Sequence, residues 1–212
     1  MTNNNKIFNS RRPLIAILRG ITPLEAESVS DVLIEAGISI IEVPLNSPQP
    51  FETIERMVKF HGENGIFGAG TVLREYDVYR VQEAGGKIIV SPNLNTLVIK
   101  KTRELNMYSI PGVFTATECF DALESGADAL KLFPASLLTE KNFQALKAVL
   151  PENTISIAVG GITENLFQSW LKVNINGFGL GSNLYKPGML VEEVKLQAQK
   201  IVKAYDNAKK MY

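Results

Sequence analysis

Cysteine and histidine are nearly absent from this chain of 212 residues, which contains only Cys119 and His61. A single cysteine excludes an internal disulfide and is typical of a reducing compartment. Two such side chains also exclude a metal site rich in histidine and cysteine ligands. We expect Cys119 to be a small packed side chain. His61, in KFHGENG, is predicted to be a solvated surface residue rather than a catalytic group.

The chain also lacks a charge surplus, because 22 Lys and Arg residues balance 22 Asp and Glu residues. This balance gives no support to a nucleic-acid or anionic-membrane partner, although it allows a local anion site. No apolar run is long enough to span a membrane. The first residues, MTNNNKIFNSRR, lack the apolar region of a secretory signal. We therefore expect a cytoplasmic protein.

Short apolar runs alternate with amphipathic helical patterns along the chain. The predicted strands are residues 14–18, 38–43, 66–69, 87–91, 107–110, 129–133, 155–159 and 177–180. Predicted helices include residues 23–36, 52–60, 74–84, 117–124, 141–150 and 191–208. Strands that are apolar throughout are typical of a sheet covered by helices on both faces. Three helices end in EAG, EAG or ESG, where glycine suits a left-handed terminal residue.

Eight strands alternating with helices predict an α/β fold, a (β/α)₈ TIM barrel forming one domain over residues 1–212. Residues 1–11 are expected to be a flexible or capping segment. A doubly wound open sheet is the alternative, but its glycine-rich first turn is missing, since RGITP follows the first strand. In a barrel, functional residues lie at the carboxyl ends of the strands.

Two charged residues interrupt apolar strands, Lys131 in ADALKLFPAS and Glu42 in ISIIEV. Because side chains two apart share a face of a strand, both point into the barrel if the branched aliphatic residues face the helices. One interpretation is a structural buried ion pair. The other is a reactive amine, since burial lowers the pKa of a lysine and a neutral amine can form a Schiff base. The Glu42 charge opposes this effect, and the sequence leaves the balance open.

Two glycine-containing segments follow the last two strands, AVGGIT at 158–163 and GLGSN at 179–183. Glycine lets the backbone approach a phosphate closely, and the amino terminus of a helix attracts anions. Phosphate sites in barrels are frequently built from these two loops. The sequence therefore predicts a phosphorylated ligand. GAGT at 68–71 is either a third such loop or a simple turn.

Segments from nearly the whole chain resemble one family, the pyruvate-dependent class I aldolases that cleave 2-keto-3-deoxy-6-phospho sugar acids (KDPG and KDPGal aldolases). The matching segments are LIAILRG, IIEVPLNSPQP, GAGTV, IVSPN, PGV with TATE, LKLFPAS, AVGGIT and GLGSNLY. The resemblance implies a (β/α)₈ barrel, a homotrimer, a phosphorylated 2-keto acid substrate and no metal or cofactor. The substrate is held covalently as a Schiff base.

The resemblance also assigns roles to individual residues of the predicted site. It implies that Lys131 forms the Schiff base and that Glu42 is the general acid and base. The remaining substrate-binding positions are Arg19 and Thr71 for the carboxylate, Pro92 and Phe133 for the pocket wall, and Gly160, Gly161, Gly181 and Ser182 for the phosphate.

Two further positions bear on the C4 epimer of the substrate. The gluconate enzymes of this family often carry arginine where this chain has Asn46, and threonine where it has Val159. The resemblance is therefore to the galactonate enzyme, with Arg19 carrying more of the carboxylate binding. The gluconate epimer stays an alternative, as do an isomerase, a synthase or a non-catalytic barrel that binds a phosphorylated ligand.

Overall fold

The computed structural model describes residues 6–9 and 12–211 of the chain. The described strands are β1 (Leu14–Ile17), β2 (Ile40–Pro44), β3 (Ile66–Gly70), β4 (Ile88–Val90), β5 (Tyr108–Ile110), β6 (Gly112–Val113), β7 (Leu130–Leu132), β8 (Ser156–Val159) and β9 (Gly177–Leu180). The described helices are α1 (Lys6–Asn9), α2 (Ala26–Ala36), α3 (Pro50–His61), α4 (Glu75–Glu83), α5 (Thr96–Glu104), α6 (Ala116–Glu124), α7 (Glu140–Lys147), α8 (Phe167–Lys172) and α9 (Val191–Lys209). Single 3₁₀ turns cover Gly62–Asn64, Ala135–Leu137 and Glu164–Leu166.

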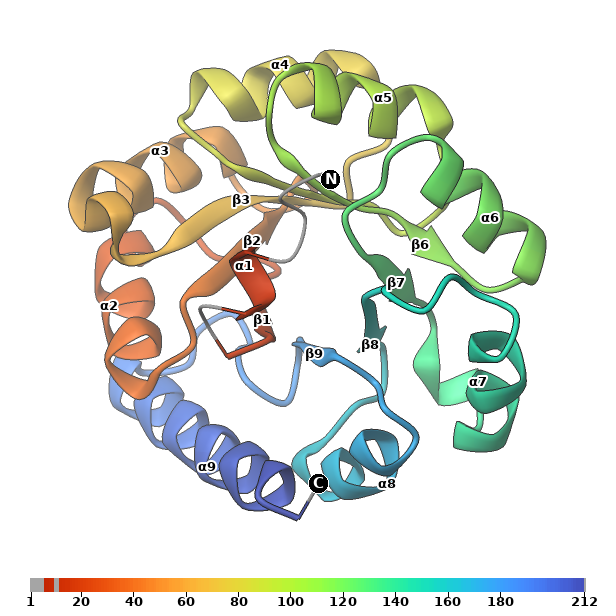
Figure 1. Cartoon of the computed structure of the whole chain (residues 1–212). Coiled ribbons are helices and arrows are strands. Elements are labelled where there is room, and N and C mark those ends of the chain that lie inside the picture. Colours follow the sequence, from red (N-terminus) through yellow and green to blue (C-terminus); the bar gives the residue numbers. More distant parts are fainter. Residues whose placement is uncertain (1–5, 10–11, 212) are drawn as a thin grey trace.

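All strand pairs are parallel, and the sheet order is β5-β4-β3-β2-β1-β9-β8-β7-β6. The two end strands, β5 and β6, are consecutive in the chain and are separated only by Pro111. Ser91 N donates to Ile110 O on one side of this segment, and Lys131 N donates to Pro111 O on the other. The predicted (β/α)₈ barrel is therefore confirmed, with its fifth strand divided at a proline (Figure 1).

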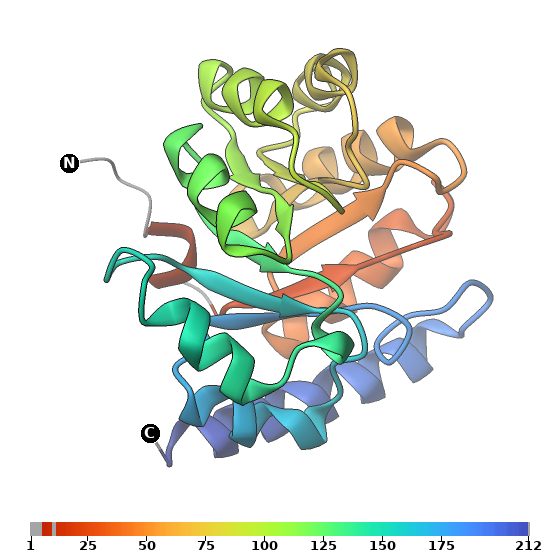
Figure 2. The same ribbon diagram turned by 90° about the vertical axis from the view of Figure 1, so that its right-hand side faces the viewer.

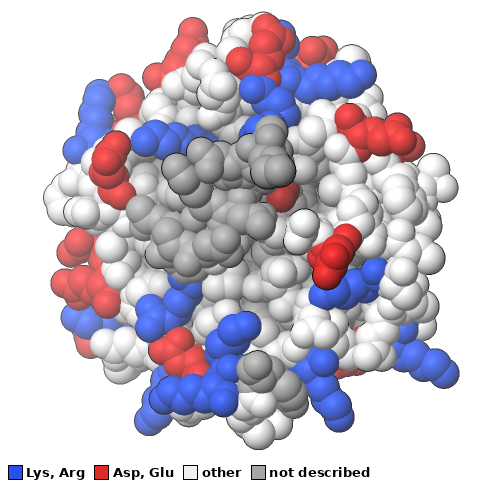
Figure 3. Space-filling view, in the orientation of Figure 1, with Lys and Arg blue, Asp and Glu red and all other residues white. Residues whose placement is uncertain are grey.

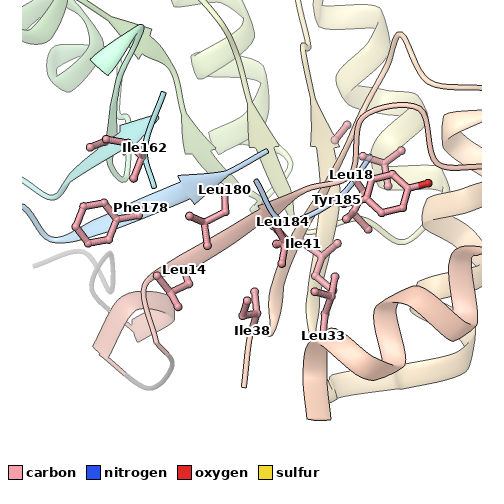
Figure 4. Packing of buried hydrophobic residues seen from close by; sticks show 14 of the residues in the cluster. Leu14, Leu18, Leu33, Ile38, Ile41, Ile162, Phe178, Leu180, Leu184 and Tyr185 are labelled. Carbon is pink, nitrogen blue, oxygen red and sulfur yellow. The ribbon is translucent and has the colours of Figure 1, made fainter. Parts of the chain in front are cut away.

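Helices form a ring outside the barrel, and α9 packs against α2 to complete it (Figure 1). The apolar residues divide between two clusters. Outward-facing residues such as Leu14, Ile41 and Leu180 pack with Leu33 of α2 in the layer between sheet and helices (Figure 4). The inward-facing cluster includes Ile15, which follows Leu14 in the chain. This alternation confirms that both faces of the strands are covered.

The short helix α1 lies across the amino-terminal end of the barrel (Figures 1 and 2). Its Ile7 and Phe8 belong to the cluster inside the barrel, and Ile7 is 1% exposed. Residues 1–5 and 10–11, also part of the predicted flexible or capping segment, lie outside the described residues. The strands point away from α1, so their carboxyl ends form the opposite face (Figure 2).

Three helix ends confirm the predicted role of glycine. Gly37, Gly85 and Gly126 have φ angles of 99°, 81° and 98°, a left-handed conformation that side chains disfavour. Thr115 forms a capping box with Glu118, which ties the start of α6 to the preceding loop.

The prediction that His61 is a solvated surface residue was wrong. Its side chain is buried, its Nε2 lies 2.8 Å from Ser30 Oγ, and its ring stacks on Phe67 with centroids 5.5 Å apart. Burial lowers the pKa of the imidazole. Ser30 and Phe67 come from α2 and β3, so the polar sequence around His61 does not reveal them. Cys119 is fully buried, which confirms its predicted packing role.

Charged side chains of both signs are interspersed around the rim of the face seen in Figure 3. No helix among residues 6–9 and 12–211 is long and apolar enough to cross a membrane. These same residues contain no group of three or more His, Cys, Asp or Glu side chains that could hold a metal ion.

Candidate functional site

A cavity of about 250 Å³ lies at the carboxyl ends of the strands. Its lining comes from almost every part of the barrel, from Arg19 after β1 round to Ser182 after β9. All the predicted site residues line it except Asn46: Arg19, Glu42, Thr71, Pro92, Lys131, Phe133, Val159, Gly160, Gly161, Gly181 and Ser182. The fold therefore brings together residues that are as much as 163 positions apart in the chain (19 to 182).

A larger cavity, of about 610 Å³, lies at the opposite end of the barrel beside Phe8 and Pro13. Its charged side chains, Lys147, Glu152 and Lys209, are all at least partly exposed. Burial lowers the pKa of Lys147, but its Nζ donates to Asn174 O, so the described residues of this cavity lack the buried, unpartnered amine or carboxylate that acid–base or nucleophilic chemistry requires. The cavity at the carboxyl ends has both.

Lys131 and Glu42 are both buried inside the barrel, with 6% and 1% of their surface exposed. Glu42 lies in the middle of β2 and Lys131 in the middle of β7. Their outward neighbours, such as Ile41 and Leu130, belong to the outer apolar cluster, so the predicted inward direction of both charged side chains is confirmed.

No direct ion pair joins Lys131 to Glu42. Glu42 Oε2 is buried and has no hydrogen-bond partner among the described residues. The Lys131 Nζ atom lies over the Phe133 ring, 4.7 Å from its centroid. A carboxylate oxygen left unsatisfied in a buried position is costly unless a ligand or water binds it. The structural ion-pair interpretation is thus disfavoured, and both groups remain available to a ligand.

Burial dominates the electrostatics of the two groups. It lowers the pKa of Lys131; the Glu42 charge partly opposes this change, and the Arg19 charge adds to it. Burial also raises the pKa of Glu42 to about 7, against the opposing effect of Lys131 and Arg19. The sequence left open whether burial or the Glu42 charge dominates the pKa of Lys131, and in the structure burial has the larger effect. A carboxyl group with such a pKa can donate or accept a proton near neutral pH.

Arg19 lies at the exposed mouth of the cavity, at the end of the β1 segment. Its Nη1 atom donates to Asn46 Oδ1, and its Nη2 atom lies 3.5 Å from Thr71 Oγ1. Asn46 therefore contacts the cavity through Arg19 rather than lining it. Thr71 has a φ angle of 57°, a strained conformation for a β-branched residue. Such strain is retained where the position of a side chain matters.

The two glycine segments lie side by side because β8 and β9 are paired. Gly160 and Gly161 have φ angles of 94° and 76°, which a side chain would disfavour. Gly181 does not have a positive φ, and a Cβ atom there would meet no protein atom within 4 Å. Its missing side chain thus leaves open space in the cavity, which fits a bound group.

Two polar lining residues were not identified from the sequence, Thr163 and Asn183. Asn183 follows Ser182 in GLGSN, and its Nδ2 atom is buried without a hydrogen-bond partner among the described residues. An unsatisfied donor beside an open glycine is suited to an acceptor on a ligand. The GLGSN segment shows a polar asparagine close to a glycine, but the direction of the asparagine side chain depends on the loop conformation, which the sequence does not give.

Comparisons with known proteins agree with this geometry. The family model described as KDPG and KHG aldolase matches residues 7–203. The chain is 48% identical over 195 residues to a probable 2-dehydro-3-deoxy-6-phosphogalactonate aldolase of Rhizobium meliloti (strain 1021), covering 92% of each chain. It is 44% identical over 201 residues to the 2-dehydro-3-deoxy-6-phosphogalactonate aldolase of Escherichia coli (strain K12), covering 95% of this chain and 98% of that one. A solved structure described as native KDPGal superposes with a TM-score of 0.92 at 45% identity, over 93% of this chain and 96% of the other.

Proposed function

Because the chain belongs to the KDPG and KHG aldolase family, we propose that it cleaves 2-dehydro-3-deoxy-6-phosphogalactonate to pyruvate and D-glyceraldehyde 3-phosphate. Lys131 forms a Schiff base with the substrate, and Glu42 transfers the protons. No metal or cofactor takes part. The observation that carries this proposal is the placement of a buried lysine and a buried, unpartnered carboxylate in one cavity.

The reaction begins with the uncharged amine of Lys131, whose pKa is lowered mainly by burial. The Nζ atom attacks the C2 carbonyl carbon of the substrate to form a carbinolamine. Glu42, with a pKa of about 7, donates a proton to the C2 hydroxyl, which leaves as water. The product is an iminium ion, and Glu42 is now the carboxylate.

The Glu42 carboxylate next accepts the proton of the C4 hydroxyl, which becomes the aldehyde as the C3–C4 bond breaks. The electron pair of that bond moves into the iminium and gives an enamine. After glyceraldehyde 3-phosphate leaves, the enamine takes a proton from Glu42 at C3. Water then hydrolyses the imine, which releases pyruvate and restores Lys131.

Two sets of residues hold the ends of the substrate in this proposal. Arg19, held by Asn46, and Thr71 bind the C1 carboxylate at the cavity mouth. Gly160, Gly161, Gly181 and Ser182 surround the 6-phosphate. Pro92 and Phe133 form walls of the cavity. Binding at two points remote from the reacting bond orients C2 against Lys131.

Val159 supports the galactonate epimer. It lies on the inward face of β8 at the cavity wall, and Gly179 on β9 leaves room for its methyl groups, since a Cβ at Gly179 would lie 2.7 Å from Val159 Cγ2. An apolar side chain at this position offers no hydrogen bond to a substrate hydroxyl. Both near-full-length relatives described above are named galactonate enzymes. The gluconate epimer is the second candidate substrate.

We extend the proposal to the setting of the enzyme. The phosphorylated substrate and product are charged molecules of the cell interior, so a cytoplasmic location fits the reaction. A homotrimer is the proposed assembly. Large apolar side chains exposed on and between α4 and α6, among them Tyr76, Leu97 and Phe114, are compatible with a subunit interface.

Reductive trapping tests the Schiff base directly. Borohydride added with pyruvate reduces the imine, so intact-protein mass spectrometry should show one stable adduct per chain, located at Lys131 by peptide mapping. The matched control is Lys131→Met, which should not be labelled. Failure of the wild-type protein to be trapped would falsify the assignment and favour a phosphate-binding isomerase, synthase or binding protein.

The epimer is tested by measuring kcat/KM for the two C4 epimers side by side, with pyruvate release as the readout. We expect a higher value for the galactonate substrate. A higher value for the gluconate substrate would assign the chain to the second candidate function while leaving the Schiff-base mechanism in place.

A further inference from the structure

Gly70 is the last residue of β3 and lies beside Glu42 in the barrel. It does not adopt a positive φ, unlike Gly160 and Gly161, which line the cavity. Any residue can adopt the backbone conformation found at position 70, so its φ angle does not require glycine. The reason for glycine must therefore be the space that a side chain would occupy.

That space is taken by the carboxyl group of Glu42. A Cβ atom built on Gly70 would lie 1.8 Å from Glu42 Oε2, 2.2 Å from its Cδ and 2.3 Å from its Oε1. These distances are far shorter than any van der Waals contact. An alanine at position 70 is thus incompatible with the present position of the carboxylate.

The neighbouring inward glycine of β3 has a different neighbour. A Cβ on Gly68 would lie 2.0 Å from the backbone carbonyl oxygen of Ile88, on the adjacent strand β4. Substitution of Gly68 would therefore push two strands apart. Substitution of Gly70 would instead push against the end of one side chain, whose Oε2 atom has no hydrogen bond to hold it among the described residues.

We propose that Gly70 is a positioning residue that sets where the Glu42 carboxylate lies relative to Lys131. This inference rests on the proposed function, since it assigns Gly70 to the proton transfers of that reaction. Because position 70 has no side chain, the Glu42 carboxylate can lie directly against the backbone of β3. Any side chain there displaces the carboxylate from the reacting atoms without altering its chemistry.

The test compares Gly70→Ala with wild type in kcat, KM, thermal unfolding and borohydride trapping. We expect kcat to fall about a hundredfold, the scale of a misplacement of about 1 Å at a reacting centre. KM for the phosphorylated substrate should change less than kcat, because the glycine loops follow β8 and β9, which are not neighbours of β3 in the sheet. Prolonged trapping with pyruvate should still label Lys131. The matched control, Gly68→Ala, should lower the unfolding temperature more than Gly70→Ala does.

A double variant separates a steric effect on Glu42 from a general effect on β3. Glu42→Asp shortens the side chain by one methylene and withdraws the carboxylate from position 70. The effects of substitutions at two residues in contact are not additive. If Gly70 acts through Glu42, adding Gly70→Ala to the Glu42→Asp variant should therefore lower kcat by less than about threefold. If Gly70→Ala lowers kcat by the same factor in the wild-type protein and in the Glu42→Asp variant, the inference is overturned.

The remaining outcomes also decide the matter. If Gly70→Ala alone does not fold, recovery of folded protein by the double variant supports the clash with Glu42, and continued misfolding overturns it. Gly70→Ala with kcat within about twofold of wild type overturns it as well. Failure of the proposed function is distinguishable, because wild-type protein would then not be trapped by pyruvate and borohydride.

Discussion

Asp128 and Lys131 lie three residues apart, the first two residues before β7 and the second in its middle, and they are equally buried, with 5% and 6% exposed. Asp128 is fully partnered. Its carboxylate accepts hydrogen bonds from Arg103 Nη1 at 2.7 and 2.9 Å and from Ser109 N at 2.8 Å. These bonds join α5 and β5 to the segment that leads into β7, so the fold itself satisfies the charge of Asp128.

Lys131 has no such partners within residues 6–9 and 12–211; its Nζ atom contacts the Phe133 ring and faces the cavity. Two buried charges three residues apart thus differ, because the fold pairs the carboxylate of Asp128 and leaves the amine of Lys131 facing the cavity. Burial alone does not distinguish a structural charge from a functional one, because both are desolvated. The distinction lies in whether the polar atoms are satisfied by the fold or left for a ligand.

The largest effect should follow substitution of Lys131. Lys131→Met removes the proposed nucleophile, and we expect aldol cleavage to fall by about 10⁴-fold or more. The free energy of unfolding should be unchanged or higher, since an apolar side chain of similar size replaces a desolvated, unpartnered amine. Pyruvate release and urea unfolding measure the two quantities. A marked loss of stability would mean that Lys131 is structural, like Asp128.

Glu42 should make stability depend on pH in a defined direction. Burial raises its pKa from 4.5 to about 7, so between these values the folded protein holds a proton that the unfolded chain has released. The contribution of this group to the free energy of unfolding therefore falls as pH rises from about 4.5 to about 7. Its full size is about 3 kcal/mol, because each pKa unit corresponds to ~1.4 kcal/mol.

Glu42→Gln isolates this effect because glutamine stays neutral. Wild type and variant should have similar free energies of unfolding at pH 5. At pH 8 the variant should be the more stable, by up to this full value, which already includes the opposing effect of Lys131. Urea unfolding at several pH values measures the difference. Parallel curves for the two proteins would show that Glu42 titrates in the fold as it does in the unfolded chain.

Local patterns predicted much of this molecule. Apolar runs located the strands to within about two residues, and alternation correctly turned Glu42 and Lys131 inward. The division of the fifth strand was missed; the segment after Ile110 contains Pro111, which lacks a backbone N–H and interrupts the strand. Helix α5 was not predicted, because its buried residues include the polar Thr102 beside Val98 and Ile99.

The missed features depend on contacts between distant segments. His61 lies in the mostly polar segment KFHGENG but packs on Phe67. Gly70 has the appearance of an ordinary turn residue but lies against Glu42. Asn46 acts on the cavity only through Arg19. Such relations are set by strand register and loop conformation, which a single sequence does not encode in any short pattern.

The smallest effect, and the one confined to stability, should come from Asp128. Asp128→Asn keeps the size of the side chain but removes the charge that Arg103 faces, so we expect a loss of about 2 kcal/mol in the free energy of unfolding. The matched control is Asp206→Asn, whose ion pair with Arg12 is 39% exposed on both sides and should be worth less than ~1 kcal/mol. Activity per folded molecule should stay within about twofold of wild type in both variants. A selective loss of kcat in Asp128→Asn would show that the charges of Asp128 and Lys131 are coupled, and that satisfaction by the fold does not separate structure from function here.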